Sequence, residues 1–169
     1  MSYTQKFKLP ICTSRECASN FNLLLINEKT YDAFLEYLKN NFTPGLRLLL
    51  LWTDLNVFKH TSLEPKKDIN LLASEIYENY IKENSEKYVD FPSEIITMIE
   101  NSYKNSKKNE YNACFDEVMQ YVYRTLKENY FLNFKQSDSY RELEKDLESD
   151  EIIYSRLLAS SMISNTELI

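Results

Sequence analysis

Apolar residues recur at helical spacing along most of the chain. In the clearest segment they stand at positions i, i+3, i+4, i+7 and i+11, which form one stripe on a helix: Tyr31, Phe34, Leu35, Leu38 and Phe42. Two later segments repeat the pattern, one with Ile69, Leu72, Ala73, Ile76 and Tyr80 and the other with Phe115, Val118, Met119, Val122 and Leu126. These stripes predict amphipathic helices over residues 31–42, 68–83 and 112–127.

A fourth segment, residues 46–59, is apolar on most faces and is expected at the centre of the fold. We expect Thr43-Pro44-Gly45 to end the helix before it, because proline cannot continue a helix and the chain's only glycine permits a turn. A shorter helix is predicted after Pro92. Helices of this kind, joined by short or moderate loops, predict an antiparallel four-helix bundle.

The two ends of the chain are expected to add smaller elements. Residues 1–19 are weakly patterned and predict an extended arm, whereas Phe21–Ile26 predicts a short helix. A short aromatic helix is expected near residues 130–134, and Ser139 with Glu142 forms a capping box that opens another helix. The expected organisation is an all-α protein with an N-terminal arm (1–19), a helical domain (20–150) and a C-terminal helical tail (151–169).

Composition removes several function classes. The net charge of −6 disfavours nucleic acid as the main partner, since phosphate binding requires a basic face. A single glycine excludes phosphate-binding and dinucleotide-binding loops, and His60 is the only histidine. The cysteines, Cys12, Cys17 and Cys114, lack the partners for a zinc site and are expected to be reduced thiols. We therefore expect no metal, no cofactor and no active site of the chain's own.

Membrane contact is expected to be peripheral at most. The strongest apolar run, Leu48–Trp52, is far shorter than the ~20 residues of a membrane span, and no signal-peptide core opens the sequence. Lys104, Lys107 and Lys108 could meet acidic lipid headgroups, but so few charges are explained as well by solubility. A cytoplasmic monomer is the expectation.

Five segments, taken in order, resemble a regulator of G-protein signalling (RGS) domain. They are YDAFLEYL (31–38), LLWTDLNVFK (50–59), ASEIYENYI (73–81), CFDEVMQYV (114–122) and FLNFKQSDSY (131–140). Each motif is weak alone, but the order and spacing over residues 22–148 are family-like. The resemblance implies a four-helix bundle plus a subdomain formed by the terminal helices.

The resemblance also implies a partner and an activity. RGS domains bind Gα subunits of heterotrimeric G proteins and accelerate GTP hydrolysis, with the catalytic Arg and Gln supplied by Gα. Such a partner would recruit the chain to the inner face of the plasma membrane. Three loops at one end of the bundle make the contact in the family. Carried over to this sequence, they contain Thr43, Pro44, Gly45, Arg47, Leu48, Val89, Asp90, Phe91, Asn129, Tyr130 and Asn133.

The polar residues of these loops depart from the family pattern. Arg47 and Leu48 replace a Glu-Asn pair, Asp90 replaces an Asn, and Asn129 and Asn133 replace an Asp and an Arg. An ionised carboxylate only accepts hydrogen bonds, and a reversed charge can turn an attractive contact into a costly one. Two hypotheses stay open: a divergent activator of Gα, and a helical interaction module that keeps the fold without activating GTP hydrolysis.

Overall fold

The computed structural model of the chain describes residues 15–61, 69–105 and 108–164, with side chains described for 15–61, 69–102 and 113–156. Every regular element in these ranges is a helix, which confirms the expected all-α class. The chain divides into two compact units, unit 1 (Met1–Tyr37 and Phe131–Ile169) and unit 2 (Leu38–Tyr130). None of the described helices is long and apolar enough to cross a membrane.

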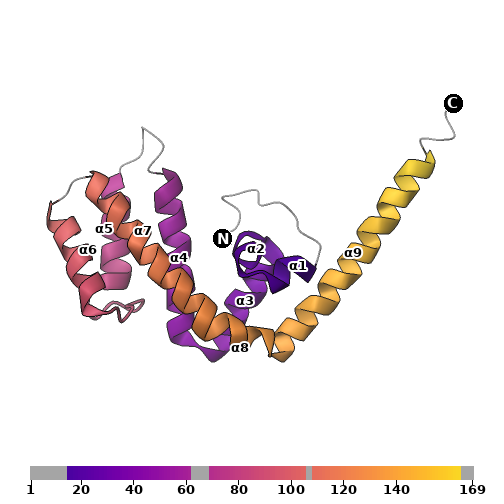
Figure 1. Ribbon diagram of the computed structural model, residues 1–169, viewed down its shortest axis with the longest axis horizontal. Helices are drawn as coiled ribbons and strands as arrows, with labels where there is room; N and C mark the ends of the chain where they lie inside the picture. The colour runs from indigo at the N-terminus through magenta and orange to yellow at the C-terminus, as the bar shows by residue number, and fades with distance from the viewer. Residues whose placement is uncertain (1–14, 62–68, 106–107, 165–169) are drawn as a thin grey trace. The chain divides into compact units, whose positions relative to one another are not determined.

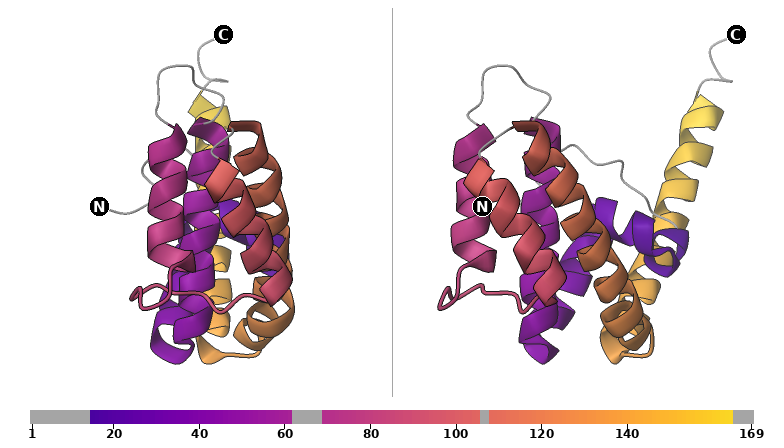
Figure 2. Two further views of the ribbon diagram at one scale, coloured as in Figure 1. Left: turned by 90° about the vertical axis from the view of Figure 1, so that its left-hand side faces the viewer. Right: turned by 60° about the vertical axis from the view of Figure 1, so that its left-hand side comes forward.

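Unit 2 contains the predicted bundle. Its helices are α4 (Thr43–Thr61), α5 (Ile69–Ile76), α6 (Ser93–Asn105) and α7 (Lys108–Thr125). Helix α7 packs against α4, α5 and α6, and α4 packs against α5, as Figures 1 and 2 show. Two π-helical segments extend this bundle: η2 (Tyr77–Ile81) continues α5, and η3 (Leu126–Phe131) continues α7.

Helix α4 supplies much of the core of unit 2, as its apolar sequence predicts. Its buried leucines and phenylalanine are Leu48, Leu49, Leu51, Leu55 and Phe58. Each such side chain contributes about 1.5–3 kcal/mol when it leaves water. The Phe58 ring meets the Phe115 ring of α7 edge-on at a centroid distance of 4.8 Å, which joins the central helix to one of the predicted stripes.

Unit 1 contains α1 (Arg15–Ser19), α2 (Phe21–Ile26), most of α3 (Glu28–Asn41), α8 (Leu132–Lys135) and α9 (Asp138–Ser164). Its core is a cluster of rings around Phe134, whose side chain is fully buried. The Phe134 centroid lies 5.2 Å from Phe34, 5.1 Å from Tyr37 and 5.3 Å from Tyr140. The cluster explains why the terminal segments are rich in aromatic residues.

Helix boundaries follow local hydrogen bonds. The Asn20 side chain accepts from the backbone N–H groups of Asn22 and Leu23 and so caps α2. Asn27 Oδ1 accepts from the N–H of Thr30 at the start of α3. The predicted capping box at Ser139 is wrong: α9 begins at Asp138, and Ser137 Oγ accepts from the N–H of Tyr140 at 3.2 Å.

Other predictions for the ends of the chain are corrected. Arg15–Ser19 is helical instead of extended, and its Cys17 and Ala18 are fully buried. Cys17 is disulfide-bonded, so the expectation of reduced thiols is wrong for this residue, whereas Cys114 is a free, buried thiol. The side chains of Lys104, Lys107 and Lys108 lie outside the described residues, as does most of the predicted arm.

A polar contact crosses the interior of unit 2. The Tyr80 hydroxyl, on a residue only 1% exposed, donates to Asp54 Oδ2 at 2.6 Å and joins η2 to α4. A hydrogen bond to a charged acceptor is stronger than one between neutral groups. Leaving an acceptor inside a protein without its donor lowers the stability of the folded state.

Replacing Tyr80 with Phe is therefore expected to lower the free energy of unfolding by about 1–2 kcal/mol, since the substitution removes only the hydroxyl donor. Urea denaturation followed by circular dichroism measures the change. Tyr154→Phe removes the same atom from a residue that is 55% exposed and is the matched control. Equal stability of the two variants would contradict a structural role for the Tyr80–Asp54 bond.

Candidate functional site

Three segments that are far apart in sequence meet at one end of unit 2. Helices α4 and α6 begin at this end, and α5 and α7, with their extensions η2 and η3, finish there (Figures 1 and 2). The segments are the first turns of α4, the loop of residues 82–92, and η3. We call this the loop end of the bundle. It contains every predicted site residue except Asn133, which belongs to unit 1.

The first segment is helical, contrary to its prediction as a turn. Helix α3 ends at Asn41, and Thr43, Pro44 and Gly45 form the first turn of α4. Proline fits there because the first N–H groups of a helix have no partner within the helix. Thr43 and Pro44 are exposed, whereas Leu48 is buried.

Gly45 allows a close approach of α4 to η3. A Cβ atom built on Gly45 would lie 2.8 Å from two ring carbons of Tyr130 and 2.9 Å from Leu38 Cδ2. The Tyr130 ring also contacts Phe42, with centroids 5.6 Å apart. The structure describes no glycine with a positive φ. Glycine is thus needed here for space, which corrects the expectation that it provides backbone freedom.

The second segment is held by its backbone and by two buried side chains. The Val89 N–H donates to the Tyr80 carbonyl at 2.9 Å, and Arg47 Nη1 donates to the Tyr88 carbonyl at 3.1 Å. Val89 is 6% exposed and Phe91 is 4% exposed. Asp90, between these two anchors, is exposed. Alternation in an extended segment therefore turns the Asp90 carboxylate toward solvent.

The third segment places an amide beside a ring. Asn129 is exposed on η3, and the half-buried Tyr130 fills the space next to Gly45. Burial raises the pKa of the Tyr130 phenol, and the nearby Tyr121 raises it further, so Tyr130 stays neutral and packs as a ring. Asn133 is exposed on α8 and is described with unit 1.

The predicted site residues divide by accessibility. Thr43, Pro44, Asp90 and Asn129 are exposed, while Arg47 and Tyr130 are half-buried. The remaining predicted site residues of the loop end are buried in unit 2: Gly45, Leu48, Val89 and Phe91. The contact of Arg47 with the Tyr88 carbonyl was missed from sequence, because a side chain that reaches a backbone atom 41 residues away leaves no local pattern.

The exposed groups suit hydrogen bonding to a protein partner. They comprise a hydroxyl on Thr43, a carboxylate on Asp90 and an amide on Asn129. No cluster of His, Cys, Asp or Glu within the described residues could hold a metal ion. His60, exposed near the end of α4, follows Thr43 by nearly five turns of helix and so lies toward the opposite end of the bundle.

Comparison with known proteins bears on these features. The family model for the regulator of G protein signaling domain matches residues 20–143, a span that includes the whole loop end of the bundle. A search of the curated proteins finds no match.

Replacing Gly45 with Ala tests the close approach to Tyr130. Helix propensity alone would stabilise α4 by up to about 1 kcal/mol, since alanine is the better helix former. The contact at 2.8 Å predicts the opposite sign, a loss of about 1–3 kcal/mol from overpacking. Urea denaturation measures the free energy of unfolding, and Thr43→Ala, on an exposed residue of the same turn, is the control.

Two observations decide this prediction. In the Gly45→Ala background, Tyr130→Leu should cost less than it does alone, because the smaller side chain makes room for the added methyl group. A Gly45→Ala protein that is more stable than the wild type would show that the Tyr130 ring moves aside freely, and the proposed packing constraint would then be rejected.

Proposed function

Since this chain belongs to the regulator of G protein signaling family, we propose that it binds a Gα subunit through the loop end of the bundle and accelerates hydrolysis of the GTP bound there. The family match over residues 20–143 is the observation that carries the proposal. RGS domains regulate GTP hydrolysis and are not enzymes with their own catalytic site. The reacting groups, an Arg and a Gln, would come from Gα.

The geometry of the loop end supports such a role. Acceleration without chemistry requires a rigid surface that holds the partner's mobile segments in a reactive arrangement. Arg47 links the first turns of α4 to the 82–92 loop, and the Gly45–Tyr130 contact links them to η3. We propose Thr43, Pro44, Asp90 and Asn129 as the residues of this surface that touch Gα. Asn133 belongs to unit 1, and its contact with Gα stays a prediction from the sequence.

The residues that depart from the family pattern determine which groups on Gα the loop end could bind. Asp90 can only accept hydrogen bonds, so its partner on Gα would be an N–H, a hydroxyl or a cationic side chain. Asn129 can both donate and accept. The Arg47 guanidinium lies against a backbone carbonyl and is half-buried, so its role in this proposal is to hold the 82–92 loop.

A second candidate is binding without activation. The specific observation in its favour is that Gly45, Leu48, Val89 and Phe91 are buried, which leaves few exposed groups at the loop end. A small polar contact area can suffice for recognition and still leave the switch segments of Gα free to move. Both candidates imply a cytoplasmic site of action, next to membrane-attached Gα.

Single-turnover GTP hydrolysis by a panel of Gα subunits tests the proposal. We expect the chain to raise the hydrolysis rate at least about tenfold for one or more subunits, equivalent to about 1.4 kcal/mol of barrier. Asp90→Lys should remove most of this acceleration, because it reverses the one carboxylate between the two buried anchors. Asp146→Lys, the same charge change on an exposed residue of α9, is the control.

The result separates the candidates. Tight binding to Gα–GDP–aluminium fluoride with no acceleration would leave only the interaction module. An absence of both binding and acceleration across the Gα classes would reject both.

A further inference from the structure

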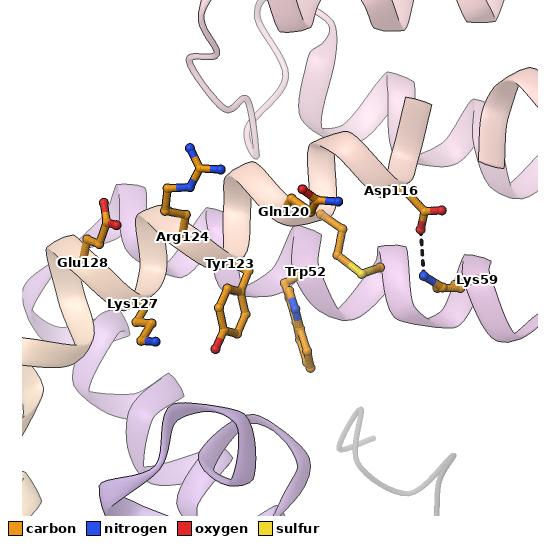
Figure 3. Close-up of a pocket in the computed structure, with 9 residues that line it drawn as sticks. Trp52, Lys59, Asp116, Gln120, Tyr123, Arg124, Lys127 and Glu128 are labelled. Atoms are coloured by element: carbon orange, nitrogen blue, oxygen red, sulfur yellow. Dashed lines mark hydrogen bonds and ion pairs between the residues drawn. The ribbon is translucent and has the colours of Figure 1, made fainter. Parts of the chain in front are cut away.

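A groove runs along the bundle between α4 and α7 and continues onto η3. Its volume is about 630 Å³, and it is lined by Trp52 of α4, by Met119, Tyr123 and Arg124 of α7, and by Lys127 of η3, among other residues. We call it the α4–α7 groove. It shares no residue with the proposed Gα contacts, and Figure 3 shows its lining side chains.

The middle of the groove is aromatic and apolar. Met119, Tyr123 and Lys127 are spaced four residues apart and therefore lie along one face of α7 and its extension. Trp52 faces them from α4, and in Figure 3 the Trp52 ring, the Tyr123 ring and the Lys127 side chain extend to the same side of α7. The Trp52, Met119 and Tyr123 side chains are half-buried, so each keeps a surface that a ligand can cover.

The two ends of the groove differ in charge. At one end Lys59 Nζ lies 2.7 Å from Asp116 Oδ1, so these charges neutralise each other (Figure 3). At the other end Lys127 Nζ lies 5.9 Å from the centre of the Tyr123 ring. Within the described residues, neither Lys127 nor Arg124 forms an ion pair. In Figure 3 the Arg124 and Glu128 side chains extend to the opposite side of α7, which leaves Lys127 as the cation beside the Tyr123 ring.

The dimensions favour a peptide over a small molecule. Twelve residues of helix separate Asp116 from Glu128, which corresponds to a length of ~18 Å. An extended peptide of about five or six residues spans this distance. The groove is open along its length, whereas a site for a small ligand encloses most of the ligand's surface.

We propose that the α4–α7 groove binds a short segment of a partner protein in which a large apolar side chain is followed by acidic residues. The apolar side chain packs against Trp52, Met119 and Tyr123. The acidic residues lie against Lys127, whose positive charge on this wall of the groove contrasts with the net charge of −6 of the whole chain. Large aromatic side chains of this kind commonly dominate the energy of protein interfaces.

The chain contains one tryptophan, so its fluorescence reports on this groove directly. The probe is an eight-residue peptide with Phe and Leu at its centre followed by three glutamates, without Trp or Tyr. Titration into the full chain should give a saturable change in Trp52 emission. A matched peptide with three lysines in place of the glutamates should bind at least about tenfold more weakly, a difference of about 1.4 kcal/mol.

Charge reversal gives the decisive comparison. Lys127→Glu, on an exposed residue, should weaken the acidic peptide at least about tenfold and strengthen the lysine peptide, a reversal that a general loss of structure cannot produce. Lys145→Glu makes the same change on an exposed residue of α9 and should alter neither affinity. Tyr123→Ala should weaken both peptides, because it removes part of the apolar wall they share.

Three outcomes would overturn the proposal. One is the absence of any saturable change in Trp52 emission, together with no heat of binding for the acidic peptide at millimolar concentration. Another is that the wild-type chain binds the acidic peptide and the lysine peptide with equal affinity, and that Lys127→Glu changes neither affinity. The last is a concentration-dependent dimer that shields Trp52 and excludes the peptide, which would assign the groove to a second copy of the chain.

Discussion

The close approach of Gly45 to the Tyr130 ring is the contact on which the loop end of the bundle depends. It brings the first turn of α4 against η3, although 85 positions separate the two residues in sequence. Any side chain at position 45 would have to displace an aromatic ring that is itself packed on Phe42. Protein interiors are close-packed, so such a displacement is transmitted to neighbouring groups. Two of the three segments thus share one packing constraint.

The third segment is connected through polar contacts. Arg47 follows Gly45 by two residues and reaches the Tyr88 carbonyl, and the adjacent Val89 is bound to η2 through its N–H. The buried Val89 and Phe91 then leave Asp90 as the residue turned outward. A loop held by buried anchors loses little conformational entropy when it binds, which is the property a stabilising surface for Gα would need.

Family membership and detailed function rest on different parts of the chain. The match to the RGS family spans residues 20–143, and the apolar stripes within this span supply many of the buried core residues. The predicted contact groups are a separate set, and Arg47, Asp90 and Asn129 differ there from the family pattern. Because fold and contact chemistry are separable, this chain can retain the bundle while its partner contacts change. The α4–α7 groove offers a second surface that does not depend on those contacts.

The helices could be predicted from the sequence because a 3.6-residue period of apolar side chains has few other ways to leave water. The stripes through Phe34, Tyr80 and Phe115 were therefore placed correctly, and all three residues are buried. The residues at which helices begin and end were harder to predict. Thr43-Pro44-Gly45 can end one helix or begin the next, and Ser137 and Ser139 can each cap a helix. Local preference alone does not decide between such alternatives.

The sequence by itself determined the class of fold and the family, since both follow from local periodicity and motif order, and it predicted three segments that would contact Gα. Only the tertiary structure decided which residues of those segments are exposed. Val89 and Phe91 became anchors, Asp90 a surface group, Arg47 a link to a distant carbonyl and Gly45 a point of contact. The physical reason is that accessibility depends on which distant side chains pack against a residue, and those neighbours are brought together only by folding.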